Sequence, residues 1–258
     1  MDRANVLGVR VHAIDITRAA DRIEWALANS EKGYVCVTGV HGVMEAQNHP
    51  EFKAILNQAL LTVPDGMPTV WVGKLQGFRH MKRVFGPDLM TELCKRSVHK
   101  GYTHFLYGGA PGVAEQLKIA LTSRFPGINV VGTHTPPFRP LTQAELGQLK
   151  NTITTLKPDL FWIGLSTPKQ ERFMATHLHD LNTKVMIGVG AAFDIHTGRL
   201  RDAPDWVKNM GLQWLHRLAQ EPGRLWKRYL LNNPRFVWRI ALQLLNLNPR
   251  IDAGDTSA

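Results

Sequence analysis

The sequence predicts an α/β fold in which helices flank a largely parallel sheet and a basic helical appendage follows it. Three observations predict this architecture. Short β-rich runs alternate with helical stretches through the first two thirds of the chain, as they do in folds with a parallel sheet. Several of these runs, 159–166 among them, are almost continuously apolar, which is typical of strands covered on both faces. After about residue 200 the β-rich runs end and the remaining segments have helical patterns.

The predicted core occupies residues 1–200. Its strand candidates, in chain order, are 34–40, 60–66, 103–109, 128–134, 159–166 and 184–194. Helical segments are expected between them, at 49–60, 88–101, 110–125 and 144–157. Gly101 suits a helix C-terminus, because glycine adopts left-handed backbone angles without strain.

The predicted appendage occupies residues 201–250 and consists of three helical pieces. They are expected at 203–220, at 224–233 and from Pro234 onward, because proline starts a helix more readily than it continues one. The third piece carries an apolar stripe, at Phe236, Val237, Ile240, Ala241 and Leu244. The last residues, 251–258, are expected to form a disordered tail.

The composition excludes several classes of protein. The 258 residues are 44% hydrophobic and 20% charged, unlike disordered, collagen-like or coiled-coil chains. Two cysteines, Cys36 and Cys94, have no CxxC spacing, so we expect neither a disulfide scaffold nor a structural zinc site. The longest apolar run, 185–193, is far shorter than the roughly 20 residues of a membrane span. Because the first residues also lack the apolar core of a signal peptide, we expect a soluble, cytoplasmic protein.

The net charge of +10 is concentrated near the end of the chain. Residues 206–250 contain eight Lys and Arg residues, four of the seven tryptophans and a single acidic residue, Glu221. Such a segment favours an anionic partner, which is a phosphate-bearing substrate, an acidic membrane surface or a nucleic acid. A solvated basic face over an ordinary helical core explains the same pattern, and both interpretations stay open.

Candidate binding residues follow the predicted strands. Ligands of open parallel sheets bind at the carboxyl ends of the strands, and here each strand runs into small residues, a carboxylate or a helix start. The candidates are Thr38 and His41, Asp65, Gly108 and Gly109, Gln170 and Glu171, and Asp194. Ordinary roles remain for several of them: Asp65 suits a turn, and either glycine suits a tight connection from strand to helix.

Familiar cofactor motifs are incomplete. The run GVGAAF resembles a dinucleotide fingerprint, but Phe193 stands where the third glycine belongs. The loop 108–112 lacks the Gly-Lys-Ser/Thr ending of an ATP-binding loop. Neither a pair of aspartates two residues apart nor an HExxH run suggests a catalytic metal. We therefore expect no cofactor and no metal.

An ordered set of motifs covers residues 5 to 230. The stretches are NVLGV (5–9), VPDGMP (63–68), FGPDLM (85–90), FLYGG (105–109), GLSTPKQE (164–171), GVGAAFDIHTGRLRDAPDW (188–206) and GLQWLHRLAQEPGRLWKRY (211–229). In this order they resemble the WecG/TagA/CpsF glycosyltransferases, glycosyltransferase family 26. The resemblance implies a Rossmann-like core and a C-terminal appendage that closes the active site and meets the membrane.

The implied activity is metal-independent transfer, with inversion, of a sugar from a UDP-sugar to a polyprenyl-diphosphate-linked acceptor. Such enzymes act in the synthesis of teichoic acid, enterobacterial common antigen and exopolysaccharides. The implied location is the inner face of the cell membrane, with an anionic surface bound through 206–250. The sugar is not identified, and a homo-oligomer stays open.

The resemblance also implies roles for individual residues. Asp65 matches the catalytic base, Thr38 and Gln170 match pocket residues, and Asp194 matches the Asp after the GVGxxF run. The family's appendage arginines correspond to Arg217 and Arg224, with Lys227 and Arg228 beside them. Arg217, Arg224 and Arg228 are the candidates to hold the diphosphate. Many relatives carry asparagine two residues after the threonine, where this chain has Val40 followed by His41. Two interpretations stay open: His41 replaces the hydrogen bond of that asparagine, or the acceptor differs.

Two rival functions remain at this point. One is a nucleotide-dependent oxidoreductase, which would show cofactor absorbance. The other is a nucleic-acid-binding module that uses the basic appendage, for which binding would depend steeply on salt. The glycosyltransferase interpretation, with no nucleic-acid partner, predicts saturable binding of UDP instead.

Overall fold

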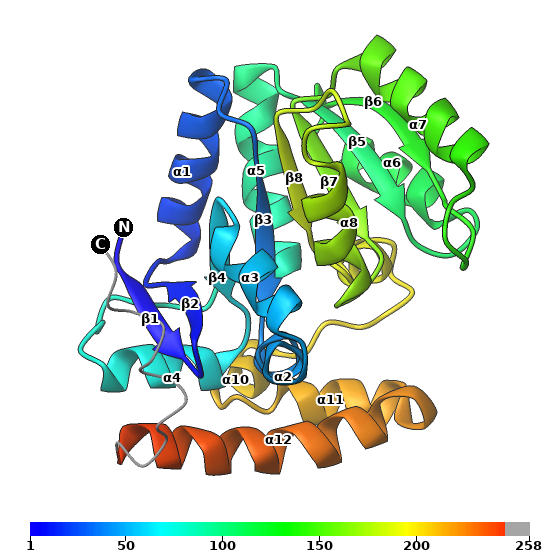
Figure 1. Ribbon diagram of the computed structural model, residues 1–258. Helices are drawn as coiled ribbons and strands as arrows, with labels where there is room; N and C mark the ends of the chain where they lie inside the picture. Colours follow the sequence, from blue (N-terminus) through cyan, green and yellow to red (C-terminus); the bar gives the residue numbers. More distant parts are fainter. Residues whose placement is uncertain (246–258) are drawn as a thin grey trace.

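The computed structural model describes residues 1–245 and confirms an α/β fold around one parallel sheet (Figure 1). The six strands lie in the order β4-β3-β8-β7-β5-β6, and every neighbouring pair is parallel. They are β3 (Gly33–Thr38), β4 (Leu61–Pro64), β5 (Thr103–Gly108), β6 (Asn129–His134), β7 (Leu160–Gly164) and β8 (Val185–Gly188). All six fall on predicted runs, although β8 ends earlier than the run 184–194 suggests.

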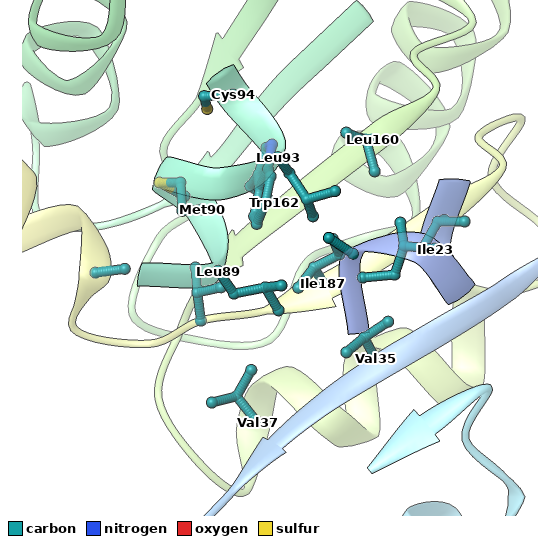
Figure 2. Packing of buried hydrophobic residues seen from close by; sticks show 14 of the residues in the cluster. Ile23, Val35, Val37, Leu89, Met90, Leu93, Cys94, Leu160, Trp162 and Ile187 are labelled. Carbon is teal, nitrogen blue, oxygen red and sulfur yellow. The ribbon is translucent and has the colours of Figure 1, made fainter. Parts of the chain in front are cut away.

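Helices cover both faces of the sheet. One face packs against α1 (Ile16–Ala28), α5 (Gly86–Lys100), α6 (Val113–Arg124) and α9 (Ala192–His196). The other packs against α2 (Val40–Asn48), α3 (Pro50–Gln58), α7 (Gln143–Leu156) and α8 (Lys169–His177). Along β3, Val35 and Val37 face the first layer while Tyr34 and Cys36 face the second, as the two-residue period of a strand requires. Figure 2 shows the first layer, with Val35 among its buried side chains.

A hairpin precedes the sheet and was not predicted. Strands β1 (Arg3–Val6) and β2 (Val9–His12) pair antiparallel. Leu7 and Gly8 join them with φ angles of 55° and 81°, which match the left-handed turns that favour hairpins. The Gly8 N–H donates to Oδ1 of Asn5 at 2.7 Å. Each strand has only four residues, too few for a clear alternating pattern.

The last helices lie across the carboxyl end of the sheet. After α4 (Met67–Leu75) within the core, the C-terminal part contains α10 (Asp205–Asn209), α11 (Gln213–Gln220) and α12 (Pro222–Leu244). In Figure 1, α12 crosses the bottom of the view below α2, α4 and α11. No helix of residues 1–245 is long and apolar enough to cross a membrane.

The predicted break at Pro234 is wrong, because α12 is one helix with this proline inside it. Proline leaves the carbonyl four residues earlier without its donor, at a cost of about 3 kcal/mol or more. The helix is stabilised by buried side chains before and after Pro234: Leu225 precedes the proline, and Phe236 and Ile240 follow it. The predicted tail, 251–258, lies outside the described residues, as do residues 246–250.

The apolar stripe predicted on the third piece divides between two faces. Phe236 and Ile240 pack into the core, so the stripe as a whole does not face outward. Val237 and Trp238, each 66% exposed, do face outward. Some hydrophobic residues of α12 therefore pack into the core, and others lie on the surface.

The end of α12 is bonded to the N-terminal hairpin. Oε1 of Gln243 accepts the Leu7 N–H at 2.9 Å, and Nε2 of Gln243 donates to the Asn5 carbonyl at 2.8 Å. These bonds fix one end of α12, which lies beside α2 at its middle. The predicted boundary between 1–200 and 201–250 stays a prediction.

Candidate active site

A cleft of about 1540 Å³ opens at the carboxyl ends of the strands. Its walls come from the connections that follow β3, β4, β5, β7 and β8, from the loop 136–141, and from α11 and α12. The expected convergence of the strand-end loops is therefore present. The C-terminal helices complete the cleft on the side away from the sheet.

Asp65 lies in this cleft directly after β4. Its N–H donates to the Thr38 carbonyl at 2.9 Å, which joins the ends of β3 and β4. Gly39 permits this contact, because a Cβ there would lie 2.5 Å from the Asp65 carbonyl oxygen. Gly66, with φ of 96°, then turns the chain into α4. The carboxyl group of Asp65 accepts no hydrogen bond from residues 1–245, so it is available to a ligand.

Burial raises the pKa of Asp65 from 3.8 to about 6, although Arg83 and Arg217 oppose the shift. Loss of hydration destabilises the carboxylate, and the two guanidinium groups recover only part of that loss. At neutral pH the carboxyl group is mostly ionised, yet its proton affinity is well above that of an ordinary aspartate. These are the properties of a general base.

Arg83 is a site residue that the sequence analysis missed. Its Nη1 donates to Oε1 of Gln213 at 3.0 Å, its Nη2 lies 3.6 Å from Oδ2 of Asp88, and its guanidinium lies 4.8 Å from the centre of the Phe85 ring. Arg83 therefore links the start of α11 to the surroundings of Asp65. Its partner Gln213 is 130 residues away in the chain, so no local pattern indicates the role.

Thr38 lies beneath the cleft and not on its surface. It is the last residue of β3 and is buried, and its hydroxyl has no hydrogen-bond partner among residues 1–245. Its Cγ2 lies against α2, where a Cβ at Gly42 would approach it to 3.0 Å. Thr38 thus lies under the floor of the cleft, and its role in binding the substrate stays a prediction.

His41 lines the cleft and contacts α12. Nδ2 of Asn232 lies 3.3 Å from Nδ1 of His41. Burial, together with the nearby Arg228, lowers the pKa of His41 to about 4, while a hydrogen bond with the Thr167 backbone opposes the shift. The ring is therefore neutral at pH 7, and Nδ1 acts as acceptor for Asn232 when Nε2 carries the proton.

The two glycines after β5 have different positions. Gly109 lines the cleft, whereas Gly108 packs against β7, where its Cβ would lie 2.7–2.9 Å from the Gly164 backbone. The Gly109 N–H already donates to the Gly164 carbonyl at 3.1 Å. The Gly109 amide is therefore already paired, and ligand binding at the two glycines stays a prediction. The close approach of β7 explains Gly108, and the Val113 side chain, 2.8 Å from where a Cβ would lie, explains Gly109; their φ angles are 127° and 77°.

Gln170 and Glu171, at the start of α8, have separate roles. Gln170 lines the cleft, and its Oε1 accepts the Gly190 N–H at 3.1 Å while its Nε2 donates to Glu171 at 3.1 Å. Glu171 is buried below it and also accepts the Thr167 hydroxyl at 2.8 Å. Burial raises the pKa of Glu171. Glu171 therefore supports Gln170 and Thr167 in this structure, and its expected role in substrate binding stays a prediction.

Cationic side chains line the opposite wall. Arg217 comes from α11, and Arg224 and Arg228 lie one turn apart on α12, as their spacing predicted. Arg217 and Arg224 both contact Glu221, whereas Arg228 forms no ion pair with a carboxylate of residues 1–245. Burial and the neighbouring arginines lower the pKa of Arg228. A partly buried, unpaired guanidinium facing a cleft is suited to an anionic ligand.

Asp194 also lines the cleft, in the first turn of α9. Its Oδ1 lies 3.7 Å from Nε of Arg199, and burial raises its pKa. Lys208 lines the cleft as well, but Asp202 and Asp205 hold its Nζ at 2.8 and 2.9 Å. Within residues 1–245 no group of three or more His, Cys, Asp or Glu side chains is placed to hold a metal ion.

Aromatic and proline residues form a further wall that the sequence analysis did not identify. Tyr107, Phe173 and the loop 136–141 line the cleft. The ring of Tyr107 stacks on Phe173 with centroids 4.8 Å apart, and on His134 at 5.6 Å. Trp214 and Tyr229, on α11 and α12, contribute rings 5.7 Å apart at the cationic wall.

Comparison with known proteins identifies the family of the chain. Residues 4–250 match the model of the glycosyl transferase WecG/TagA/CpsF family. Two similar curated proteins are N-acetylglucosaminyldiphosphoundecaprenol N-acetyl-beta-D-mannosaminyltransferases. The one from Bacillus spizizenii is 29% identical over 86% of this chain and 84% of its own length. The one from Staphylococcus aureus strain MRSA252 is 27% identical over 93% and 92%.

The match spans the hairpin, the sheet and the C-terminal helices, including each wall of the cleft. It covers far more than half of the 258 residues. The motifs quoted from the sequence lie within it in the same order. This chain belongs to the WecG/TagA/CpsF glycosyltransferase family.

Proposed function

We propose that this enzyme transfers a sugar, with inversion and without a metal, from a UDP-sugar to a polyprenyl-diphosphate-linked acceptor in bacterial cell-envelope polysaccharide synthesis. One observation carries the proposal: a desolvated carboxylate, Asp65, shares a cleft with the guanidinium groups of Arg217 and Arg228. The names of the relatives support the acceptor class, because those enzymes act on N-acetylglucosaminyldiphosphoundecaprenol.

In the proposed reaction, an acceptor hydroxyl attacks the anomeric carbon of the donor. The new C–O bond forms as the bond to UDP breaks, and the electron pair of that bond leaves with the β-phosphate oxygen. Asp65 takes the proton of the hydroxyl, an effect typically worth about 10²–10⁴-fold in rate. A single displacement of this kind inverts the anomeric carbon.

Fixed cations stabilise the leaving diphosphate in this proposal. Arg217 and Arg228 supply planar donor groups with permanent charge, suited to phosphate oxygens. The positive charge of Arg217 lowers the pKa of Asp65, and that of Arg228 lowers the pKa of His41. The proposed base and the proposed diphosphate site are therefore neighbours.

The lipid part of the acceptor has a matching surface. Leu230, Val237 and Trp238 of α12 are exposed and line the cleft, so apolar surface continues from the cleft to the outside. The exposed cations Lys227 and Arg235 lie on the same helix. Apolar side chains beside basic ones are typical of helices that lie on anionic membranes. We propose that α12 contacts the inner face of the cell membrane.

The test is a panel of UDP-sugars with a synthetic lipid-diphosphate-linked N-acetylglucosamine acceptor. UDP-N-acetylmannosamine comes first, because the relatives' names contain that sugar. We expect UDP release with one donor, unchanged by excess EDTA. Asp65→Asn should lower turnover by at least about 100-fold and should not weaken UDP binding.

The matched control is Asp180→Asn, which neutralises an exposed aspartate outside the cleft, paired with Lys150. It should transfer at the wild-type rate. A lack of transfer from every donor, or more than roughly a tenth of wild-type turnover in Asp65→Asn, contradicts the proposal. Loss of activity in EDTA with recovery on adding Mg²⁺ contradicts metal independence.

A further inference from the structure

We infer that Glu221 limits the positive charge of the diphosphate subsite, so that the cleft binds a UDP-sugar but releases UDP. The inference rests on the proposed function, because it assigns the diphosphate to the arginines of α11 and α12. Glu221 is the residue that joins these two helices.

The geometry places one carboxylate between two cleft arginines. Oε1 and Oε2 of Glu221 accept from Nε and Nη2 of Arg224 at 2.8 and 2.6 Å, and Nη2 of Arg217 lies 3.3 Å from Oε2. Both arginines line the cleft, and among its lining residues in the described chain Glu221 is absent. The carboxylate thus lies behind the guanidinium groups, on the side away from the ligand.

Glu221 remains ionised in this position. Burial opposes its ionisation, but the bonds from Arg224 and Arg217 outweigh burial and lower the pKa of Glu221. Arg217, Arg224 and Arg228 supply three positive charges and Glu221 removes one, so the group carries a net charge of two.

The donor and the product differ by about one charge. The diphosphate of a UDP-sugar is a diester with about two negative charges. UDP ends in a phosphate whose second ionisation lies near pH 6, so UDP carries about three at neutral pH. The net charge of plus two on the arginine group balances the two negative charges of the donor diphosphate. The carboxylate of Glu221 repels the third negative charge that UDP carries.

A purely structural role for Glu221 predicts the opposite result. If Glu221 only held the two arginines in place, its neutralisation would scatter them and weaken every phosphate ligand. The backbone is fixed independently, because the Glu221 N–H donates to the Arg217 carbonyl at 3.0 Å and its own carbonyl accepts the Leu225 N–H at 3.1 Å. Glutamine keeps an oxygen acceptor for Arg224, so Glu221→Gln removes charge with little loss of geometry.

The experiment is calorimetric titration of the full-length enzyme with UDP and with the β-methyl ester of UDP. The ester has nearly the size of UDP and about the charge of the donor. We expect Glu221→Gln to bind UDP roughly three- to tenfold more tightly, the range for one partly exposed charge. Its affinity for the ester should rise by a smaller factor, because the ester carries about two negative charges and UDP about three. Glu221→Ala, a second neutral variant, should shift the ratio of the two affinities in the same direction.

Glu92→Gln is the matched control, because Glu92 also pairs with an arginine four residues away, Arg96, at 2.7 Å and lies outside the cleft. It changes the net charge of the protein equally and should leave both affinities unchanged. Unchanged or weaker UDP binding in Glu221→Gln, or equal tightening for UDP and the ester, overturns the inference. Failure of the wild-type enzyme to bind UDP at all would instead overturn the proposed function.

Discussion

Nδ2 of Asn232 lies 3.3 Å from Nδ1 of His41, although the two residues are 191 positions apart in the chain. The contact joins the middle of α12 to the first turn of α2. Both residues line the cleft. Asn232 therefore helps to hold the cationic wall opposite the strand ends.

Asn232→Ala should lower kcat/KM about fivefold, because it removes one hydrogen bond worth about 1 kcal/mol between the two walls of the cleft. Steady-state kinetics with a soluble acceptor measure the change. Asn48→Ala, at the exposed end of α2, is the control and should behave as wild type. Equal kinetics for all three proteins would show that this contact does not position the wall.

The rate of transfer should depend on pH through Asp65. With a pKa of about 6, the base is increasingly protonated below that pH, and kcat/KM should fall about tenfold for each pH unit. His41, with a pKa of about 4, stays neutral over the same range. A profile from about pH 5 to about pH 8 checks this, and a flat profile down to pH 5 would exclude Asp65 as the base.

Asp65 should also destabilise the folded protein at neutral pH. Its pKa is about 6 when folded and 3.8 ordinarily, so the folded state binds the proton more tightly and stability falls as pH rises through 6. Asp65→Asn avoids this cost. Its free energy of unfolding should exceed that of the wild type by on the order of 2 kcal/mol above pH 7, and should equal it below about pH 3. Urea unfolding at both pH values measures the difference.

Asp159→Asn is the control for that measurement, because it should change the stability in the opposite direction. Its carboxylate accepts the Thr103 N–H at 2.9 Å and pairs with Lys184 at 2.8 Å, and its pKa is lowered. This variant should lose stability at neutral pH. A stability gain for Asp159→Asn, or none for Asp65→Asn, would contradict the assigned directions.

Arg228→Ala should weaken UDP binding by about tenfold or more, because a hydrogen bond to a charged group is worth about 1.5–3 kcal/mol. It should also raise the pKa of His41, which Arg228 lowers, and NMR titration of the ring reports that shift. Arg235→Ala, an exposed cation two turns further along α12, should change neither value. Unchanged UDP affinity in Arg228→Ala would remove this residue from the diphosphate site.

Membrane contact should depend on the exposed face of α12. Leu231, 61% exposed and outside the cleft, is suited to a test. Leu231→Glu should lower binding to anionic phospholipid vesicles about tenfold, since burying a leucine is worth about 1.5–3 kcal/mol, and should preserve transfer to a soluble acceptor. Ile119→Glu, a 70% exposed residue of α6, is the control. Equal vesicle binding in the two variants would contradict the proposed contact.

The sheet could be predicted because its strands are buried on both faces. In β7, four consecutive residues, Leu160–Ile163, are completely buried, and such a run is visible without a structure. The hairpin could not be predicted, because four-residue strands show little periodicity and Leu7 adopts positive φ without being glycine. Continuity of α12 through Pro234 depends on tertiary burial, which overrides the local preference of proline.

The site could be predicted at the level of loops but not of side-chain direction. Strand ends correctly indicate the segments that contain Asp65 and Gln170. They do not reveal that Thr38 of β3 and Glu171 of α8 are buried outside the cleft lining. One residue of shift reverses the facing of a strand side chain, and successive side chains of a helix also point in different directions. Arg83 shows the remaining limit, since its role arises from a contact between distant parts of the chain.

The bonds from Gln243 to Asn5 and Leu7 set an order of events during synthesis. Leu7 leaves the ribosome early, and its partner follows 236 residues later, which takes roughly 10–50 s at about 5–20 residues per second. Late in that interval, once β8 (Val185–Gly188) has been made, the nascent chain has all its strand-end loops but not yet α12. In the proposed function, donor binding therefore begins only after translation has delivered α12, because the proposed diphosphate site includes Arg224 and Arg228 of that helix.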